Sequence, residues 1–309
     1  MYLKQGWLSP AYVTTDKSGK ITNISDQHSA EVNEEINGFA ITPITNSHSH
    51  AFQYGMAGLT ENIPQGQGHD NFWSWRDRMY RLADQINPDQ MESIAKMLYA
   101  EMLRAGYNHV VEFHYLRNDE KGNNYTNPNE MSDRLISAAL KVGMKITLVP
   151  VYYRCSDFGK EPSEAQKRFQ FSSTESYFKH IESLSSTYAS NTEVTIGYGL
   201  HSLRIATANE IKEIISYNLE LPCHLHISEQ MKEVDACVQY LGARPVEWLT
   251  TETEVGSNCH LVHSTHITND EMNAIIRADA NVVICPTTEG NLGDGFFPIS
   301  DYIKANGRW

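Results

Sequence analysis

The sequence lacks the features of several classes of protein. No uninterrupted apolar run approaches the roughly 18 residues that a helix needs to cross a bilayer, and residues 1–6 contain no basic stretch before an apolar core. Basic residues are scarce as well: 25 Lys and Arg stand against 38 Asp and Glu, which gives a net charge of −13. Nucleic acids and anionic membranes both require a basic face. We therefore expect a soluble, cytoplasmic protein that binds neither.

A disulfide framework and a structural zinc knuckle are not indicated either. The chain has 5 cysteines, an odd number, and no two of them form a C-x-x-C pair. They are Cys155, Cys223, Cys237, Cys259 and Cys285. We interpret them as reduced thiols of a cytosolic protein, because secreted small domains pair their cysteines.

Two regions of the chain differ in their pattern. Residues 1–38 contain two strand-like runs, Tyr12–Thr15 and Ile21–Ile24, around a glycine turn, which predicts an incomplete portion of a small β-sandwich. From Phe39 onward, short apolar runs alternate with helical stretches, a pattern typical of βα units around a parallel sheet. The 309 residues have room for a (β/α) barrel, which needs about 250. We predict an α/β protein with a small N-terminal β appendage and a barrel over residues 39–309.

Seven strands are predicted in the second region. They are Phe39–Thr45, His109–His114, Lys145–Tyr152, Val194–His201, Leu221–Ile227, His260–His263 and Asn281–Cys285. Between them, Asn87 caps one helix, Gly143 ends another and Thr268 begins a capping box, whereas Glu61–Trp75 is predicted as a loop. The pattern is that of a (β/α)8 TIM-type barrel with about seven units. Because an open parallel barrel leaves two exposed edges, we expect a fragment that stops before strand eight.

Histidines at the ends of two predicted strands indicate a metal site. His48 and His50 lie two residues apart, so in an extended segment both rings face the same side and can bind one ion. His226 follows the same logic at the end of another strand, and Glu229 lies three residues beyond it. A bare H-x-H is also compatible with unrelated surface histidines, and His224 is better explained as a packed core residue. The position favours a site, because barrel active sites lie at the C-terminal ends of strands.

Other strand ends carry polar groups too. His263 ends an apolar strand, where an ionisable ring is costly to bury without a partner. His201 ends the fourth predicted strand, and Glu112 and His114 end the second. Five strand ends thus carry polar, mostly imidazole groups. We interpret this convergence as an active site in which Glu229 moves the protons of a metal-activated water.

Two arginines and a tyrosine suggest the substrate. Arg76 follows the first strand, Tyr115 the second and Arg204 the fourth. In an acidic protein, arginines beside a metal site favour bidentate binding of carboxylates on a small-molecule substrate. The alternative for each arginine is a surface salt bridge.

Longer blocks of the sequence resemble one family. The run His48–Gln53, followed by Ala57–Glu61, is similar to the first-strand signature of formimidoylglutamate deiminases, which are cytosine-deaminase-like amidohydrolases. Further blocks of the same kind are Glu112–Tyr115, His201–Arg204, His226–Gln230, Gly242–Trp248 and Cys285–Gly295. The resemblance covers nearly the whole chain. Several of these blocks distinguish it from guanine and cytosine deaminases, which share only the His and Glu scaffold.

The resemblance implies a metal-dependent hydrolase over residues 39–309. Its reaction would convert N-formimino-L-glutamate to N-formyl-L-glutamate and ammonia, a step of histidine degradation. One divalent ion, expected to be Zn²⁺, would be held by His48, His50 and His226. Glu229 would carry protons between water and the leaving nitrogen, and His263 would stabilise the attacking oxygen. A homodimer is expected from the family.

The resemblance also implies the roles of five substrate-binding residues. Gln53 would face the formimino group, and His201 would line the site. Arg76, Arg204 and Tyr115 would bind the glutamate carboxylates.

Three hypotheses remain open at this stage. In the family, an aspartate at the end of strand eight is metal ligand and base, and extrapolation places it about five residues beyond Trp309. The chain is therefore expected to be a deiminase truncated before that residue, or an inactive metal-binding remnant. A third hypothesis is a deaminase of a cyclic amidine such as guanine. The arginines discriminate against it, because a neutral heterocycle gives Arg76 and Arg204 nothing to pair with.

Overall fold

The computed structural model describes residues 1–28, 32–60 and 72–309, which form two compact units, Met1–Ile44 and Thr45–Trp309. The smaller unit contains two antiparallel pairs. Strand β1 (Tyr2–Leu3) pairs with β2 (Gly6–Trp7), and β3 (Tyr12–Thr15) pairs with β4 (Ile21–Ser25). The second pair is the hairpin predicted from the sequence. Its turn is closed by Asp16, whose carboxylate accepts from the backbone N–H groups of Ser18 and Lys20.

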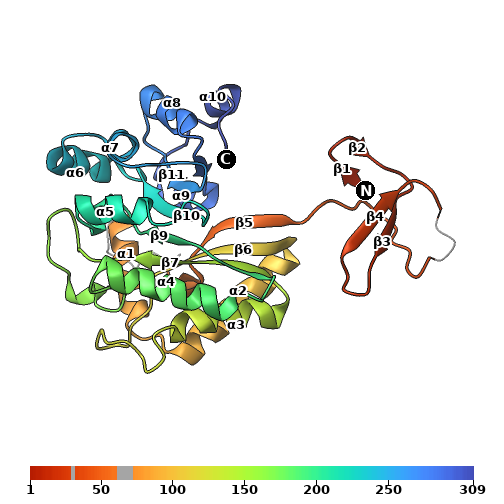
Figure 1. Cartoon of the computed structure of the whole chain (residues 1–309), viewed down its shortest axis with the longest axis horizontal. Coiled ribbons are helices and arrows are strands. Elements are labelled where there is room, and N and C mark those ends of the chain that lie inside the picture. Colours follow the sequence, from red (N-terminus) through yellow and green to blue (C-terminus); the bar gives the residue numbers. More distant parts are fainter. Residues whose placement is uncertain (29–31, 61–71) are drawn as a thin grey trace. The chain divides into compact units, whose positions relative to one another are not determined.

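The larger unit is built on one curved, mainly parallel sheet (Figure 1). Its strands are β5 (Ile44–Ser49), β6 (Tyr107–His114), β7 (Lys145–Tyr152), β8 (Val194–Ile196), β9 (Tyr198–Leu200), β10 (Cys223–Ile227), β11 (Cys259–His263) and β12 (Asn281–Val283). They lie in the order β12-β11-β10-β9-β7-β6-β5, with β8 paired to β7. Because β8 and β9 are two pieces of one predicted strand, six of the seven predicted strand positions are confirmed, and the first strand lies later in the chain than predicted. Arg308 forms a parallel bridge with Asn281 at the β12 edge.

Helices alternate with these strands. They are α1 (Phe72–Ala83), α2 (Pro88–Arg104), α3 (Glu130–Val142), α4 (Thr174–Tyr188), α5 (Ala208–Ile215), α6 (Met231–Leu241), α7 (Pro245–Glu252), α8 (Asn269–Arg277), α9 (Pro286–Leu292) and α10 (Ile299–Lys304). Short 3-10 turns are η1 (Ala51–Met56), η2 (Glu164–Gln166) and η3 (Leu203–Ile205). In Figure 1, α2, α3 and α4 lie along the same part of the sheet, and α3 and α4 both contact β7. None of the described helices is long and apolar enough to span a bilayer.

The predicted helix boundaries are confirmed at three points. Asn87 caps α2 in a reciprocal capping box with Gln90, an arrangement that typically stabilises a helix by about 1 kcal/mol. Gly143 ends α3 in the left-handed conformation, with φ 82°. Thr268 caps α8 in a second box with Glu271. Polar capping residues therefore set where α2 and α8 begin, and a glycine sets where α3 ends.

Two predictions about the first βα unit are wrong in detail. The first strand lies at Ile44–Ser49 rather than at Phe39–Thr45. The apolar start of the predicted run belongs to the small unit instead, where Phe39 stacks edge-on against Trp7 at 5.4 Å. The loop predicted over Glu61–Trp75 ends before Phe72, where α1 begins, and residues 61–71 lie outside the described part of the chain. A polar strand can form here because pairing depends on the backbone.

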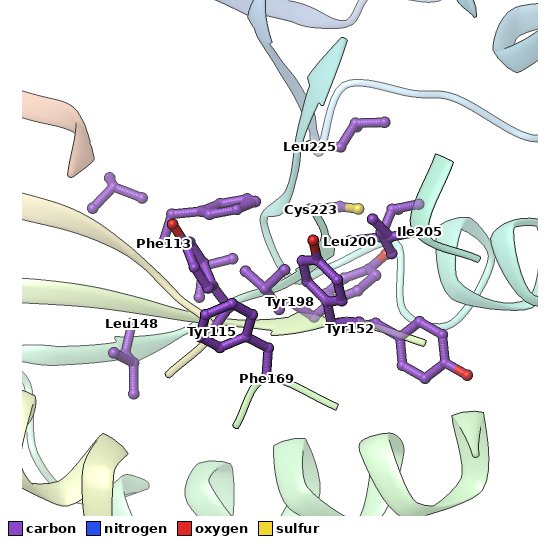
Figure 2. Close-up of a cluster of buried hydrophobic side chains, with 14 of the residues drawn as sticks. Phe113, Tyr115, Leu148, Tyr152, Phe169, Tyr198, Leu200, Ile205, Cys223 and Leu225 are labelled. Carbon is purple, nitrogen blue, oxygen red and sulfur yellow. The ribbon is translucent and has the colours of Figure 1, made fainter. Parts of the chain in front are cut away.

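Strand β10 is buried on both faces, as expected for a parallel sheet. Cys223 and Leu225 contribute to the hydrophobic cluster of Figure 2, whereas His224 and His226 alternate with them and face the other side. Its neighbour β9 approaches so closely that a β-carbon on Gly199 would overlap the carbonyl group of His224. Only glycine permits this spacing between the two strands.

Candidate active site

Three imidazole rings meet at the C-terminal ends of the strands. His48 lies in β5, His50 follows directly, and His226 lies in β10. The Nε2 atom of His48 is 3.0 Å from that of His50 and 3.0 Å from that of His226, and the third edge of the triangle is 3.3 Å. Since β5 and β10 are four places apart in the sheet order, only a strongly curved sheet can bring these rings together. The predicted grouping of the three histidines is present.

The triangle of nitrogen atoms fits a tetrahedral cation. The Nδ1 atoms of His50 and His226 face the backbone carbonyl oxygens of Phe113 and His201, each at 2.9 Å. These carbonyls can only accept, so the ring protons lie on Nδ1 and the Nε2 lone pairs point at one another. Two lone pairs at 3.3 Å repel unless a cation lies between them. Metal–nitrogen bonds of about 2.0–2.1 Å place tetrahedral ligands roughly 3.3 Å apart.

The electrostatics of the three rings suit the same purpose. Burial lowers the pKa of His50 to about 4 and holds the pKa values of His48 and His226 well below the ordinary value for histidine. The neighbouring imidazoles add to this effect, because each would repel a second positive charge. All three rings are therefore neutral at pH 7, the form that binds a metal ion.

Glu229 and His263 lie beside the triangle. Glu229 follows β10, and its backbone N–H donates to the Glu233 carboxylate at 3.1 Å, one turn into α6. His263 ends β11, and its Nε2 atom lies 3.6 Å from Glu229 Oε1. Its ring is nearly parallel to that of His226, with 5.4 Å between centroids. Burial alone would lower the pKa of His263, but Glu229 and Glu289 outweigh it and raise the pKa.

The backbone turns sharply where these groups enter the site. Ser228, His263 and Ser264 all have left-handed conformations, with φ of 52°, 71° and 50°. Non-glycine residues adopt this region at a cost, and such strained positions are concentrated at active sites. The turns direct the side chains that follow β10 and end β11 into the same space.

A second group of potential ligands lies behind His263. The Nδ1 atom of His263, the thiol of Cys285 and the carboxylate of Glu289 have ligand atoms within 4.8 Å of one another. His263 Nδ1 is 3.1 Å from Glu289 Oε1, which also accepts from the backbone N–H of Cys285 at 2.8 Å. Glu289 is buried on α9. It was not singled out from the sequence, because one carboxylate within a longer family block carries no signal of its partner.

One cavity contains every residue assigned to the site from the sequence. Its lining includes His48, His50, Gln53, Arg76, Tyr115, His201, Arg204, His226, Glu229 and His263. Sequence reasoning missed other lining residues, namely Trp75, Met79, Tyr80, Tyr153, Phe169, Thr288 and Leu292. These are mostly aromatic or apolar side chains that no strand-end pattern distinguishes from core residues.

The cavity is also lined by aromatic and cationic side chains. Tyr115 packs edge-on against Phe169, with 5.1 Å between ring centroids, and the two lie side by side in Figure 2. Its hydroxyl accepts from the Gln53 amide at 3.0 Å. Arg76 on α1 and Arg204 in η3 line both this cavity and an adjoining one that also contains Lys160 and Lys232. The site thus combines imidazole nitrogens with guanidinium groups.

Two of the strand-end residues used in the sequence argument lie elsewhere. Phe113 contacts the rings of His48, His50 and His226, so its neighbours Glu112 and His114 face the other side of β6. Glu112 accepts from the backbone N–H of Ala51 at 2.6 Å, and burial raises its pKa to about 7. Glu112 and His114 are therefore buried supports behind the site, and the second strand contributes Tyr115 instead.

Comparison with known proteins agrees with this architecture. The Amidohydrolase family matches residues 40–308. A formimidoylglutamate deiminase from Pseudomonas aeruginosa is 39% identical over 308 residues, which cover 99% of this chain and 67% of that protein. A 5-methylthioadenosine/S-adenosylhomocysteine deaminase from Lawsonia intracellularis is 21% identical over 85% of this chain and 53% of its own length. The chain thus spans between half and two thirds of these relatives.

Solved structures show the same fold. An amidohydrolase from Brucella melitensis superimposes with a TM-score of 0.93 at 39% identity, covering 99% of this chain and 68% of that one. A guanine deaminase from C. acetobutylicum with bound guanine has a TM-score of 0.77 at 18% identity, covering 97% of this chain and 68% of that one. An adenosine deaminase from Xanthomonas campestris with bound zinc has a TM-score of 0.67 at 20% identity, with coverage of 86% and 54%.

Proposed function

Because the chain belongs to the amidohydrolase family and is a hydrolase that acts on carbon–nitrogen bonds, we propose that it hydrolyses the C=N bond of N-formimino-L-glutamate. The products are N-formyl-L-glutamate and ammonia. The observation that carries the proposal is one cavity lined by a triangle of imidazole nitrogens, by Glu229 and by two arginines. These groups together suit a substrate with a basic formimino group and two carboxylates.

His48, His50 and His226 would hold one divalent cation, for which we propose zinc. Neutral imidazoles at tetrahedral spacing are typical zinc ligands. The cation supplies Lewis-acid chemistry, since it makes water more acidic and polarises a C=N bond. The carbonyl oxygens behind His50 and His226 keep both rings in the tautomer that binds a metal.

Glu229 and His263 would handle protons and charge. The Glu229 carboxylate would take a proton from the attacking water and deliver it to the leaving nitrogen. His263 would donate from Nε2 to the attacking oxygen, because this atom faces Glu229 and the ring lies beside that of His226. Gln53, held by the Tyr115 hydroxyl, would contact the formimino group.

Arg76, Arg204 and Tyr115 would select the substrate. A guanidinium binds a carboxylate through two parallel hydrogen bonds, and each charge-assisted bond of this kind contributes roughly 1.5–3 kcal/mol. Arg204 is partly buried, where a positive charge is costly without a partner, and Glu233 is one of the negative charges near it. A purine or pyrimidine carries no carboxylate for a guanidinium to bind, which is why we favour the dicarboxylate over a cyclic amidine.

The test compares substrates and one arginine variant. Ammonia release by the zinc-loaded protein is measured on N-formimino-L-glutamate and on guanine, and binding of N-formyl-L-glutamate is measured by calorimetry. We expect turnover on the first substrate only, and Arg204→Met to weaken product binding by about 10- to 100-fold. Turnover on guanine alone would overturn the proposal. Stoichiometric zinc without turnover on either compound would favour the metal-binding remnant.

A further inference from the structure

The side of His263 that faces away from the histidine triangle is occupied by a buried carboxylate. We propose that Glu289 is a positioning residue, which holds the proton of His263 on Nδ1 and thereby turns Nε2 towards the reacting centre. The inference deepens the proposed function and rests on it for the chemical role of His263. Its structural part, the state of the His263 ring, can be tested without substrate.

The contact between the two side chains is direct and enclosed. His263 Nδ1 lies 3.1 Å from Glu289 Oε1, and the residues are only 3% and 4% exposed. A carboxylate oxygen can only accept in its ionised form, so the proton between the atoms belongs to Nδ1. Water has little access to compete for this hydrogen bond, and a charge-assisted bond in such surroundings is stronger than a neutral one.

Glu289 is itself held in place from its own helix. Its Oε1 atom accepts from the backbone N–H of Cys285 at 2.8 Å, which closes the first turn of α9 on the carboxylate. Its backbone carbonyl accepts from the N–H of Asp294 at 2.9 Å, just after Gly293 ends the helix. The carboxylate is therefore held in place by contacts that do not involve His263, so it can fix the orientation of the His263 ring.

The geometry on the other side of the ring shows what this achieves. With Nδ1 engaged by Glu289, Nε2 is the nitrogen left for the site, and it lies 3.6 Å from Glu229 Oε1. The ring is within 13° of parallel to that of His226. Rotation of the ring by 180° about χ2 would put Cδ2 in the place of Nδ1 and Cε1 in the place of Nε2, and it would break the contact with Glu289. Glu289 thus selects the one ring orientation in which Nε2 faces the site.

A second cation is the competing explanation for this cluster. His263, Cys285 and Glu289 offer one nitrogen, one sulfur and one oxygen within 4.8 Å. Glu289 Oε1 already accepts two hydrogen bonds, from His263 and from Cys285. Burial also raises the pKa of the Cys285 thiol to about 12, which disfavours the thiolate that binds metals. Hydrogen bonding accounts for the arrangement, and zinc stoichiometry separates the two explanations.

The first experiment reads the ring directly. ¹⁵N-histidine-labelled, zinc-loaded protein is examined by two-bond ¹H–¹⁵N NMR, with the His263 signals assigned by their loss in His263→Asn. We expect a protonated Nδ1 in the wild type and in Glu289→Gln, whose amide oxygen still accepts, and a mixture of tautomers in Glu289→Ala. The control is Glu271→Gln, which alters another buried carboxylate, one paired with Arg244. Unchanged His263 signals in Glu289→Ala would overturn the inference.

The second experiment asks whether Glu289 acts through His263. Glu289→Ala is expected to lower kcat by about 10- to 100-fold, the loss seen when the partner of a metal-site histidine is removed, with KM and zinc content of one equivalent unchanged. Adding Glu289→Ala to His263→Asn should then cause no further loss. Independent, multiplying losses or a second zinc equivalent that disappears in Cys285→Ser would contradict it. If formiminoglutamate is not a substrate at all, the proposed function fails while the ring measurement still decides the role of Glu289.

Discussion

Strand β10 carries two buried histidines in very different settings. His226 directs Nδ1 at the carbonyl of His201 and Nε2 at two other imidazoles, whereas His224 stacks on His260 at 4.2 Å. Burial holds the pKa values of both well below the ordinary value. Burial and pKa therefore do not identify a metal ligand. The distinguishing features are the convergence of Nε2 atoms and a backbone carbonyl behind the ring.

The largest effect is expected when His226 is removed. His226→Ala deletes one corner of the nitrogen triangle, and zinc affinity is expected to fall by more than about 100-fold, because loss of the partner behind a ligand alone costs about 10- to 100-fold. Zinc content after dialysis against a weak chelator, measured by atomic absorption, checks this together with turnover. A His226→Ala protein that retains one equivalent of zinc would show that the triangle is not the metal site.

Acid is expected to have a smaller effect, and it acts on the metal-site histidines and on His224 alike. The native state resists protonation of His50, whose pKa lies at about 4 instead of 6.5. The unfolded chain binds this proton first, so the contribution to stability is complete above pH 6.5 and is lost as the pH falls towards 4. His224 contributes to stability with the same sign, because burial lowers its pKa as well.

Zinc should oppose the protonation of the three histidines of the nitrogen triangle, but not that of His224. Saturating zinc competes with protons at His48, His50 and His226 and is expected to move the acid unfolding midpoint, followed by circular dichroism, to lower pH. The shift should persist in His224→Leu and vanish in His226→Ala. An equal shift in both variants would mean that zinc binds elsewhere.

The smallest effect is expected when His224 is replaced. His224→Leu removes a buried ring whose Nδ1 atom has no hydrogen-bond partner within the described ranges, so the lost stacking is offset by the lost desolvation cost. We expect the free energy of unfolding to change by less than about 1.5 kcal/mol, with zinc content and kcat unaffected. Denaturant unfolding provides the measurement. Loss of zinc here would place His224 in the metal site and undo the distinction from His226.

The sequence was informative where regular geometry determines position. Alternation along strands and the common end of a parallel sheet predict that His48, His50 and His226 lie together, and the three residues line one cavity. The first strand is predicted too early in the chain, because Asn46 and Ser47 are polar and give no apolar strand signal. The apolar run that begins at Phe39 packs within the small unit instead, where Phe39 contacts Trp7. Contacts made by loops and short helices were the least predictable.

Glu289 and Glu112 illustrate this limit: the first lies at the site without a sequence signal, and the second has the signal but faces away from the site. Glu289 reaches His263 across 26 residues through the turn at the start of α9, and no local pattern encodes that contact. Glu112 ends a strand as expected of a site residue, yet the pleat turns it to the outer face of β6. A one-residue difference in phase decides which face a side chain occupies.

Because β9 and β10 approach closely at Gly199, this glycine affects the geometry of the metal site. Gly199 lies two residues before His201, whose carbonyl oxygen orients the ring of His226. A methyl group at position 199 would push the two strands apart and withdraw that oxygen from the imidazole. In a mutational scan, this position would resemble a metal ligand in its sensitivity, although it has no side chain to offer.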